Sequence, residues 1–204
     1  GWWRSRLGLP ERYVLYVGRL HLHKNLPRLL QAYRLYRNAE PSGWGLVVVG
    51  GGPLQGQLQR QARRLGLRDV VWVGAREFDE LPAYYGLAKA LVLPSVAETW
   101  GLSVNEGMAC GLPVLVSDRC GCVPELVEPG RNGYLLSPLH VESIATRLQQ
   151  IASMDPASLQ AMGRASREII SRYTLERWAE TFVRCISGAS PTRRGALEGQ
   201  LTAQ

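Results

Sequence analysis

Tyr13-Val-Leu-Tyr-Val-Gly18 is an uninterrupted apolar run that ends in glycine, and it is the first of five such runs in the chain. Runs that are apolar without alternation are typical of strands covered on both faces of a sheet. Amphipathic stretches with helical spacing lie between them, such as Leu26–Tyr36 and Leu54–Leu65. Strand and helix in regular succession predict an α/β fold with a doubly wound parallel sheet and right-handed crossovers. The four later runs are Leu46-Val-Val-Val-Gly50, Val70-Val-Trp-Val-Gly74, Leu91-Val-Leu-Pro94 and Pro113-Val-Leu-Val-Ser117.

The last part of the chain has a different pattern. Beyond Gly133-Tyr-Leu-Leu136 the sequence becomes purely helical, and from Ser187 onward it has no apolar period. We therefore predict one domain over residues 1–187 and a disordered tail over residues 188–204. The predicted C-terminal helices are Val141–Ala152, Ala157–Ser171 and Leu175–Ile186.

The composition is that of an ordinary globular protein, with 46% hydrophobic and 20% charged residues in a chain of 204. No apolar run approaches the ~20 residues that span a bilayer, and the N-terminus lacks the pattern of a signal peptide. We therefore expect a cytoplasmic protein, either free or peripheral on the cytoplasmic face of the membrane.

The net charge of +7 favours an anionic partner, which could be nucleic acid, anionic lipid or a phosphorylated small molecule. The sign of the charge does not choose among these three. Because the basic residues are scattered without a run of five like charges, we do not expect a nucleic-acid surface.

The cysteines and histidines do not predict a disulfide framework or a metal site. The closest cysteine pair is Cys-Gly-Cys, with no histidine within metal-ligand spacing, so we interpret all four thiols as reduced and structural. His21 and His23 could form half of a metal site, but no carboxylate is close by in sequence, which favours a plain loop. The cysteines are Cys110, Cys120, Cys122 and Cys185.

The loops that follow the strands are where a ligand should bind, because doubly wound sheets hold ligands at the carboxyl ends of their strands. After the first strand comes Gly18-Arg19-Leu-His-Leu-His-Lys24-Asn25, with Asn25 as a candidate cap of the next helix. Two permanent cations thus lie between a strand end and a helix N-terminus, where charge and helix dipole both favour an anion such as a diphosphate. Taken alone, Arg19 and Lys24 could equally be solvated loop charges.

A second polar loop follows the fourth strand, and it reads Pro94-Ser95-Val-Ala-Glu98-Thr99-Trp100-Gly101-Leu102-Ser103-Val-Asn-Glu106. A helix is expected to begin near Gly101, which puts Glu106 just past its first turn. Two carboxylates beside an anion site would repel the ligand unless they accept hydrogen bonds from it. The hydroxyl groups of a sugar nucleotide would supply those donors, and the N–H groups from Gly101 to Ser103 could meet its phosphate.

These motifs resemble family 4 of the retaining glycosyltransferases, the glycosyl transferases group 1. The spacing of Glu98 and Glu106 matches the Glu-x7-Glu pattern of that family, as do the flanking Pro-Ser and Met-Ala-Cys-Gly-Leu-Pro-Val. Val-Gly-Gly-Gly-Pro53 and Val123-Pro-Glu125-Leu-Val are also similar, and the resemblance covers about residues 12 to 187.

The resemblance implies the Rossmann-like, donor-binding half of a GT-B fold, with its N-terminal acceptor-binding domain missing. It implies transfer of a hexosyl unit from a UDP-, GDP- or ADP-sugar to a sugar, lipid or other acceptor, with retention of configuration. No cofactor is implied, and the full protein could touch the membrane. Arg19 and Lys24 would bind the diphosphate and act in catalysis, Glu106 the ribose, and Glu98 the transferred sugar. The other donor-binding residues would be Gly51, Gly74, Arg76, Thr99, Trp100, Gly101 and Leu102.

Two positions depart from the family pattern. Cys122 stands where the family commonly has the second glycine of a pair, and Trp100 where it usually has phenylalanine. The charged residues of the family pattern are present, so we expect these two departures to affect which sugar is bound more than nucleotide binding. Because the four aspartates form no Asp-x-Asp pair, we expect no metal and assign its work to fixed cations. Glu98 is given a donor-orienting or charge-stabilising role, since its sequence position does not place it behind an anomeric carbon.

Two other functions remain open from the sequence. Gly50-Gly-Gly52-Pro-Leu-Gln-Gly56 could belong to a dinucleotide-dependent oxidoreductase, but Asp69 begins the next strand where an acidic residue should end it. The chain could also be a nucleotide-sugar-binding module without catalysis of its own.

Overall fold

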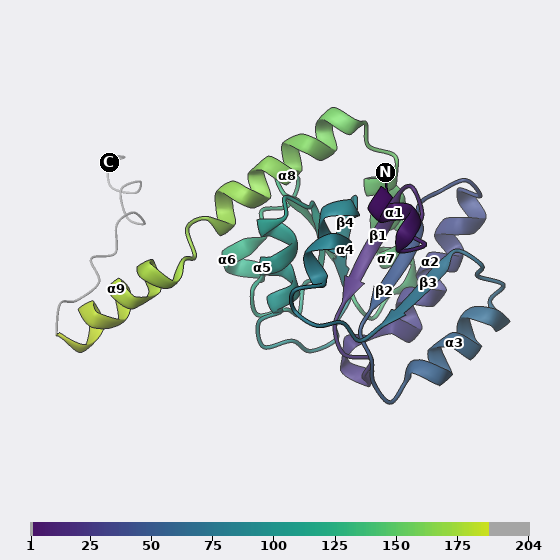
Figure 1. The fold of residues 1–204 in the computed structure, drawn as a ribbon, viewed down its shortest axis with the longest axis horizontal. Coiled ribbons are helices and arrows are strands. Elements are labelled where there is room, and N and C mark those ends of the chain that lie inside the picture. Colours follow the sequence, from purple (N-terminus) through teal and green to yellow (C-terminus); the bar gives the residue numbers. More distant parts are fainter. Residues whose placement is uncertain (1, 188–204) are drawn as a thin grey trace, which may run out of the picture. The chain divides into compact units, whose positions relative to one another are not determined.

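The computed structural model describes residues 2–187 and contains one parallel sheet of six strands (Figure 1). The strand order is β3-β2-β1-β4-β5-β6, which is the order of a doubly wound sheet whose chain reverses direction beside β1. The predicted α/β fold is therefore confirmed. The strands are β1 Tyr13–Val17, β2 Gly45–Val49, β3 Val70–Gly74, β4 Ala90–Leu93, β5 Val114–Ser117 and β6 Gly133–Leu136.

Helices cover both faces of the sheet. Right-handed crossovers place α2 and α3 on one face and α4, α5 and α6 on the other, because the chain moves in opposite directions from β1. After β6, α7 packs against α2, and α8 packs against α5 and α6 (Figure 1). The helices of this layer structure are α1 Trp2–Arg6, η1 Leu22–Lys24, α2 Leu26–Ala39, α3 Gln55–Arg64, α4 Leu81–Leu87, α5 Leu102–Ala109, α6 Val123–Leu126, α7 Val141–Ala152 and α8 Pro156–Ile170.

Buried tyrosines form part of the core, and each keeps a partner for its hydroxyl group. Tyr13 donates to the carbonyl of Tyr84 at 2.6 Å, and Tyr33 donates to the carbonyl of Trp44 at 3.0 Å. Such bonds remove most of the penalty for burying a hydroxyl group. The hydroxyl of Tyr16 donates to the carbonyl of Arg19 at 3.0 Å, which holds the start of the loop after β1 against the core.

Glycines allow the loops after β1 and β2 to pack backbone against backbone. A Cβ added at Gly50, where φ is +135°, would lie 2.0 Å from the carbonyl oxygen of Gly18. The same contact brings the N–H of Leu20 to the carbonyl of Gly51 at 2.9 Å. The glycines after β1 and β2 thus allow these two loops to pack closely at the carboxyl edge of the sheet.

The chain divides into two compact units, Gly1–Ile170 and Ser171–Gln204. The second unit contains α9 Leu175–Ile186, whose N-terminus is capped by the Thr174 hydroxyl accepting from the N–H of Arg177. On α9 the rings of Trp178 and Phe182 stack with centroids 5.3 Å apart, and both side chains are exposed.

The predicted disordered tail, residues 188–204, lies outside the described residues, and the domain boundary at residue 187 stays a prediction. Within the described part of the chain, no helix has both the length and the apolar character to cross a membrane.

The packing of the two loops predicts the effect of Gly50→Ala. The added methyl group cannot fit against Gly18, and the positive φ is strained for alanine, so we expect the free energy of unfolding to fall by about 2–4 kcal/mol. Gly86→Ala is the matched control, because a Cβ there meets nothing within 4 Å and helix propensity favours alanine. Denaturant unfolding of both variants is the measurement. Equal stability of the two would contradict the packing argument.

Candidate functional site

Backbone hydrogen bonds join the loops at the carboxyl ends of the strands into one surface. The loops after β1 and β2 meet at Leu20 and Gly51, and the N–H of Gly50 bonds the carbonyl of Gly74 at the end of β3. The N–H of Val96, after β4, donates to the carbonyl of His23 at 2.8 Å. The loop after β5 joins through Gly121, whose N–H donates to the carbonyl of Glu98 at 2.9 Å. The predicted ligand loops therefore share one continuous edge.

Lys24 and Glu98 lie at the centre of this surface and form an ion pair with each other. The side chains are only 15% and 13% exposed, so neither charge is freely solvated. The Ser95 hydroxyl lies 3.4 Å from the same Glu98 oxygen and donates to it. The sequence predicted both charged residues in a donor site but did not predict that they contact each other.

Gly101 packs directly beside Glu98 and is the N-cap residue of α5. Its φ is +103°, and a Cβ there would lie 2.8 Å from Leu93 Cδ2 and 3.4 Å from Glu98 Cγ. The N–H groups of Leu102 and Ser103 belong to the first turn of a helix and have no intrahelical acceptor. A helix N-terminus that is predicted to meet phosphate thus stands next to the Lys24–Glu98 pair.

Glu106 lies one turn into α5 and accepts a hydrogen bond from the hydroxyl of Tyr85 on α4. Burial, and then this hydrogen bond, raise the pKa of Tyr85 well above its usual value, so the hydroxyl stays protonated and keeps donating. Sequence reasoning missed Tyr85. The only available signal was a pair of adjacent tyrosines before the fourth strand.

The remaining predicted residues lie on the same loops but are held differently. The exposed Arg19 follows Gly18, and its carbonyl is bonded by Tyr16. The Nε of Arg76 donates to the Tyr84 hydroxyl at 3.1 Å, so this cation is already engaged within α4 and the loop before it.

The predicted residues after β4 complete the site. Trp100 donates from Nε1 to Asn105 at 2.9 Å, while Thr99 and Leu102 are exposed. Cys122 is fully buried, and its Sγ lies 3.7 Å from the place of a Gly101 Cβ, behind the start of α5. It therefore supports the helix N-terminus without facing solvent.

Asn25 has a larger role than the predicted helix cap. It occupies the N-cap position with φ +64°, but its side chain accepts no bond from a backbone N–H of the helix; its Oδ1 accepts from the Arg28 guanidinium at 3.1 Å. The buried amide donates to the carbonyl of Pro94 at 2.9 Å and of Pro138 at 2.7 Å. It therefore ties the Lys24 loop to the Glu98 loop and to the segment after β6.

The histidines and buried cysteines near the site show no metal-binding geometry. The Nδ1 atoms of His21 and His23 are 2.8 Å apart, and partial burial followed by nearby positive charges lowers the pKa of His23. Burial raises the pKa of Cys120 to about 12 and of Cys122 to about 11, which keeps both thiols protonated. In the described residues no group of three or more histidine, cysteine or acidic side chains could hold a metal ion.

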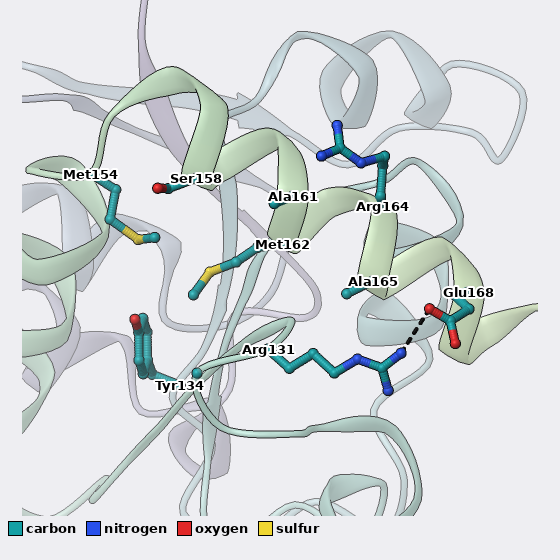
Figure 2. Close-up of a pocket in the computed structure, with 10 residues that line it drawn as sticks. Arg131, Tyr134, Met154, Ser158, Ala161, Met162, Arg164, Ala165 and Glu168 are labelled. Carbon is teal, nitrogen blue, oxygen red and sulfur yellow. Dashed lines mark hydrogen bonds and ion pairs between the residues drawn. The ribbon is translucent and has the colours of Figure 1, made fainter.

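A separate cavity of about 680 Å³ lies at the amino end of β6, against α8. Figure 2 shows Met154 and Met162 above Tyr134, and Arg131 reaching toward Glu168, which it contacts at 2.7 Å. None of the predicted site residues lines this cavity. It is therefore distinct from the carboxyl edge of the sheet.

Comparison with known proteins gives the family. The model of the glycosyl transferases group 1 matches residues 3–169. The chain belongs to the glycosyl transferases group 1. The predicted resemblance is therefore confirmed.

Individual group 1 relatives and solved structures agree with this assignment. The GDP-mannose-dependent alpha-(1-6)-phosphatidylinositol monomannoside mannosyltransferase of Mycolicibacterium smegmatis is 34% identical over 86% of this chain and 46% of its own length. Sucrose-phosphate synthase from Thermosynechococcus elongatus has 30% identity and a TM-score of 0.78, covering 92% of this chain and 49% of that one. Anabaena Alr3699/HepE in complex with UDP and glucose has 25% identity and a TM-score of 0.78, covering 91% of this chain and 51% of that one.

The solved structures confirm the predicted GT-B-type, Rossmann-like fold. The chain spans about half the length of these similar proteins. The fold also argues against the oxidoreductase alternative, which needs an acidic residue at the carboxyl end of β3. Asp69 precedes β3 and thus lies at the amino end of the sheet, away from the glycine loops.

The bonds of Asn25 predict that Asn25→Ala lowers the free energy of unfolding by about 2–3 kcal/mol, since two buried carbonyl groups lose their donor. Asn38→Ala, at an exposed position of the same helix, is the control and should change stability little. Thermal unfolding of both variants measures the difference. A variant at position 25 that unfolds like the control would show that the loops are held by other contacts.

Proposed function

We propose that this chain is the nucleotide-sugar-binding half of a retaining glycosyltransferase that transfers a hexosyl unit. The observation that carries the proposal is the Lys24–Glu98 ion pair beside the N-terminus of α5. It puts a cation, a helix dipole and a carboxylate at adjoining points of one surface. A nucleoside diphosphate sugar presents phosphate and hydroxyl groups at similarly adjoining points.

The ion pair suggests how the chain treats the donor. Without a ligand, Glu98 neutralises Lys24, so neither partly buried charge is left alone. An incoming diphosphate would compete for Lys24 and would release Glu98 to accept hydrogen bonds from the sugar. Arg19 on the same loop would supply a second guanidinium contact to the phosphates.

The same cations would stabilise the departing group during transfer. Negative charge develops on the nucleoside diphosphate as the bond to the sugar breaks, and fixed positive charges aimed at it lower the barrier. We propose that Lys24, Arg19 and the first turn of α5 do this without a metal ion. On the family resemblance we also propose retention of configuration, with Glu98 orienting the sugar or stabilising its positive charge. Glu106 would accept from the ribose.

The identity of the donor and the need for a second domain are also proposals. The relatives name different donors, since one uses GDP-mannose and another was solved with UDP and glucose. An acceptor site would lie on a further domain, such as the other half of these longer relatives. The chain alone would then bind donor without transferring sugar.

The diphosphate assignment predicts that Arg19→Ala and Lys24→Ala each weaken nucleoside diphosphate binding about ten- to a hundredfold, because a charge-assisted contact of ~1.5–3 kcal/mol is lost. A thermal-shift panel of UDP, GDP and ADP first selects the nucleotide, and calorimetric titration with EDTA present then gives the affinities. Arg60→Ala, at an exposed position of α3, should bind normally. Unchanged affinity in both loop variants, or a strict need for magnesium, would reject the assignment.

The position of Glu98 predicts a split between two ligands. Glu98→Gln removes the ion-pair partner of Lys24, so the affinity for the nucleoside diphosphate should stay level or rise. The affinity for the matching nucleotide sugar should fall roughly tenfold, because the sugar hydroxyl groups lose a charged acceptor. Titration of both ligands into the variant and into Glu142→Gln, an exposed control on α7, measures the split. Equal loss for both ligands would move Glu98 out of the sugar pocket.

A further inference from the structure

The charges of the chain are divided unevenly between the two halves of the sheet. Residues 1–74, which supply β1 to β3 with α2 and α3, contain eleven arginines and one lysine but only three carboxylates. Residues 75–170 contain seven basic and eleven acidic side chains. One half of the unit is therefore strongly basic and the other mildly acidic.

Arginines that are scattered in sequence meet where α2 and α3 end. Arg34 of α2 lies beside the turn after α3, since its Nη1 is 3.7 Å from the place of a Cβ at Gly66. Arg63 and Arg64 are the last two residues of α3, Arg68 follows the turn, and all four side chains are exposed. We call these four residues the arginine cluster.

The arginine cluster continues into a groove at the amino ends of β1 to β3. This groove has a volume of about 500 Å³, and its charged lining residues are Arg12, Arg37 and Arg68 together with the carboxylates Glu11 and Asp69. Arg37 is engaged by Asp69 at 2.9 Å. Among the described residues, Arg12 and the arginine cluster form no ion pair.

We propose that the arginine cluster and its groove dock this protein onto a bilayer that contains anionic lipids. Guanidinium groups bind phosphate well. Because these arginines are spread over α2, α3 and the following turn, they fit an array of lipid headgroups better than they fit one small anion. The helix dipoles of α2 and α3 favour cations at these ends, and the four residues of the arginine cluster outnumber the two carboxylates of the groove, Glu11 and Asp69.

Two observations favour a membrane over a nucleic acid. The cluster offers no exposed aromatic ring on α2 for stacking with bases, because Tyr33 and Tyr36 are buried. Beside Arg34, the apolar Leu35 is 43% exposed and could enter the headgroup region. The surface lies at the amino ends of the strands, so docking would leave the carboxyl edge open, and the inference does not rest on donor binding.

The test is co-sedimentation of the chain with vesicles of phosphatidylcholine, with and without phosphatidylglycerol. Each arginine near an anionic surface strengthens binding roughly fivefold, so Arg63→Gln/Arg64→Gln should weaken binding to the anionic vesicles roughly twenty-fivefold. Arg34→Gln/Arg68→Gln should act alike, while Arg164→Gln/Arg167→Gln on α8 removes the same charge elsewhere and should have little effect. Binding should vanish at about 1 M salt.

Several results would overturn the proposal. Equal binding to neutral vesicles would exclude an electrostatic surface, and equal loss in the α8 control would make net charge the cause. Wild-type binding by both cluster variants would exclude these arginines. Tighter binding to a DNA duplex than to the anionic vesicles would favour a nucleic acid. Circular dichroism confirms that each variant is folded.

Discussion

Parallel pairing of six strands in one sheet is the constraint on which the rest of the structure depends. It sends every strand's carboxyl end to the same edge, and the loops there bind one another through their own backbones. The close packing of these loops requires glycine at positions 18 and 50. The buried side-chain amide of Asn25 adds a hydrogen bond to the loop after β4. The loops are therefore ordered by the fold before any ligand arrives, which reduces the entropy that binding must overcome.

The charges of the site follow from that arrangement. Lys24 and Glu98 are 74 positions apart in sequence, yet the loops after β1 and β4 bring them into contact because β1 and β4 are neighbours. The pair keeps two partly buried charges compensated, and it stands where the dipole of α5 favours an anion. A diphosphate bound there would exchange one anionic partner of Lys24 for another. Donor binding and the freeing of Glu98 would thus be one event.

The sequence was sufficient for the fold and for the set of loops that share the carboxyl edge of the sheet. Continuous apolar runs located the strands to within about one residue of their bounds, and α7 and α9 begin and end as predicted. The candidate site residues were predicted from loop position and family motif, and their roles stay predictions. Their contacts were not, because Tyr85 with Glu106, and Lys24 with Glu98, depend on which strands are neighbours. For the same reason the arginines looked scattered until α2 and α3 brought them together.

Hydrogen–deuterium exchange of the chain, with and without the nucleoside diphosphate that binds it, tests the central claim most directly. If the carboxyl edge is the donor site, the ligand should slow exchange in residues 18–25 and 94–106 together, since the two loops act as one surface. Protection confined to residues 130–134 and 154–168, around the cavity at the amino end of β6, would place the ligand elsewhere and contradict the account.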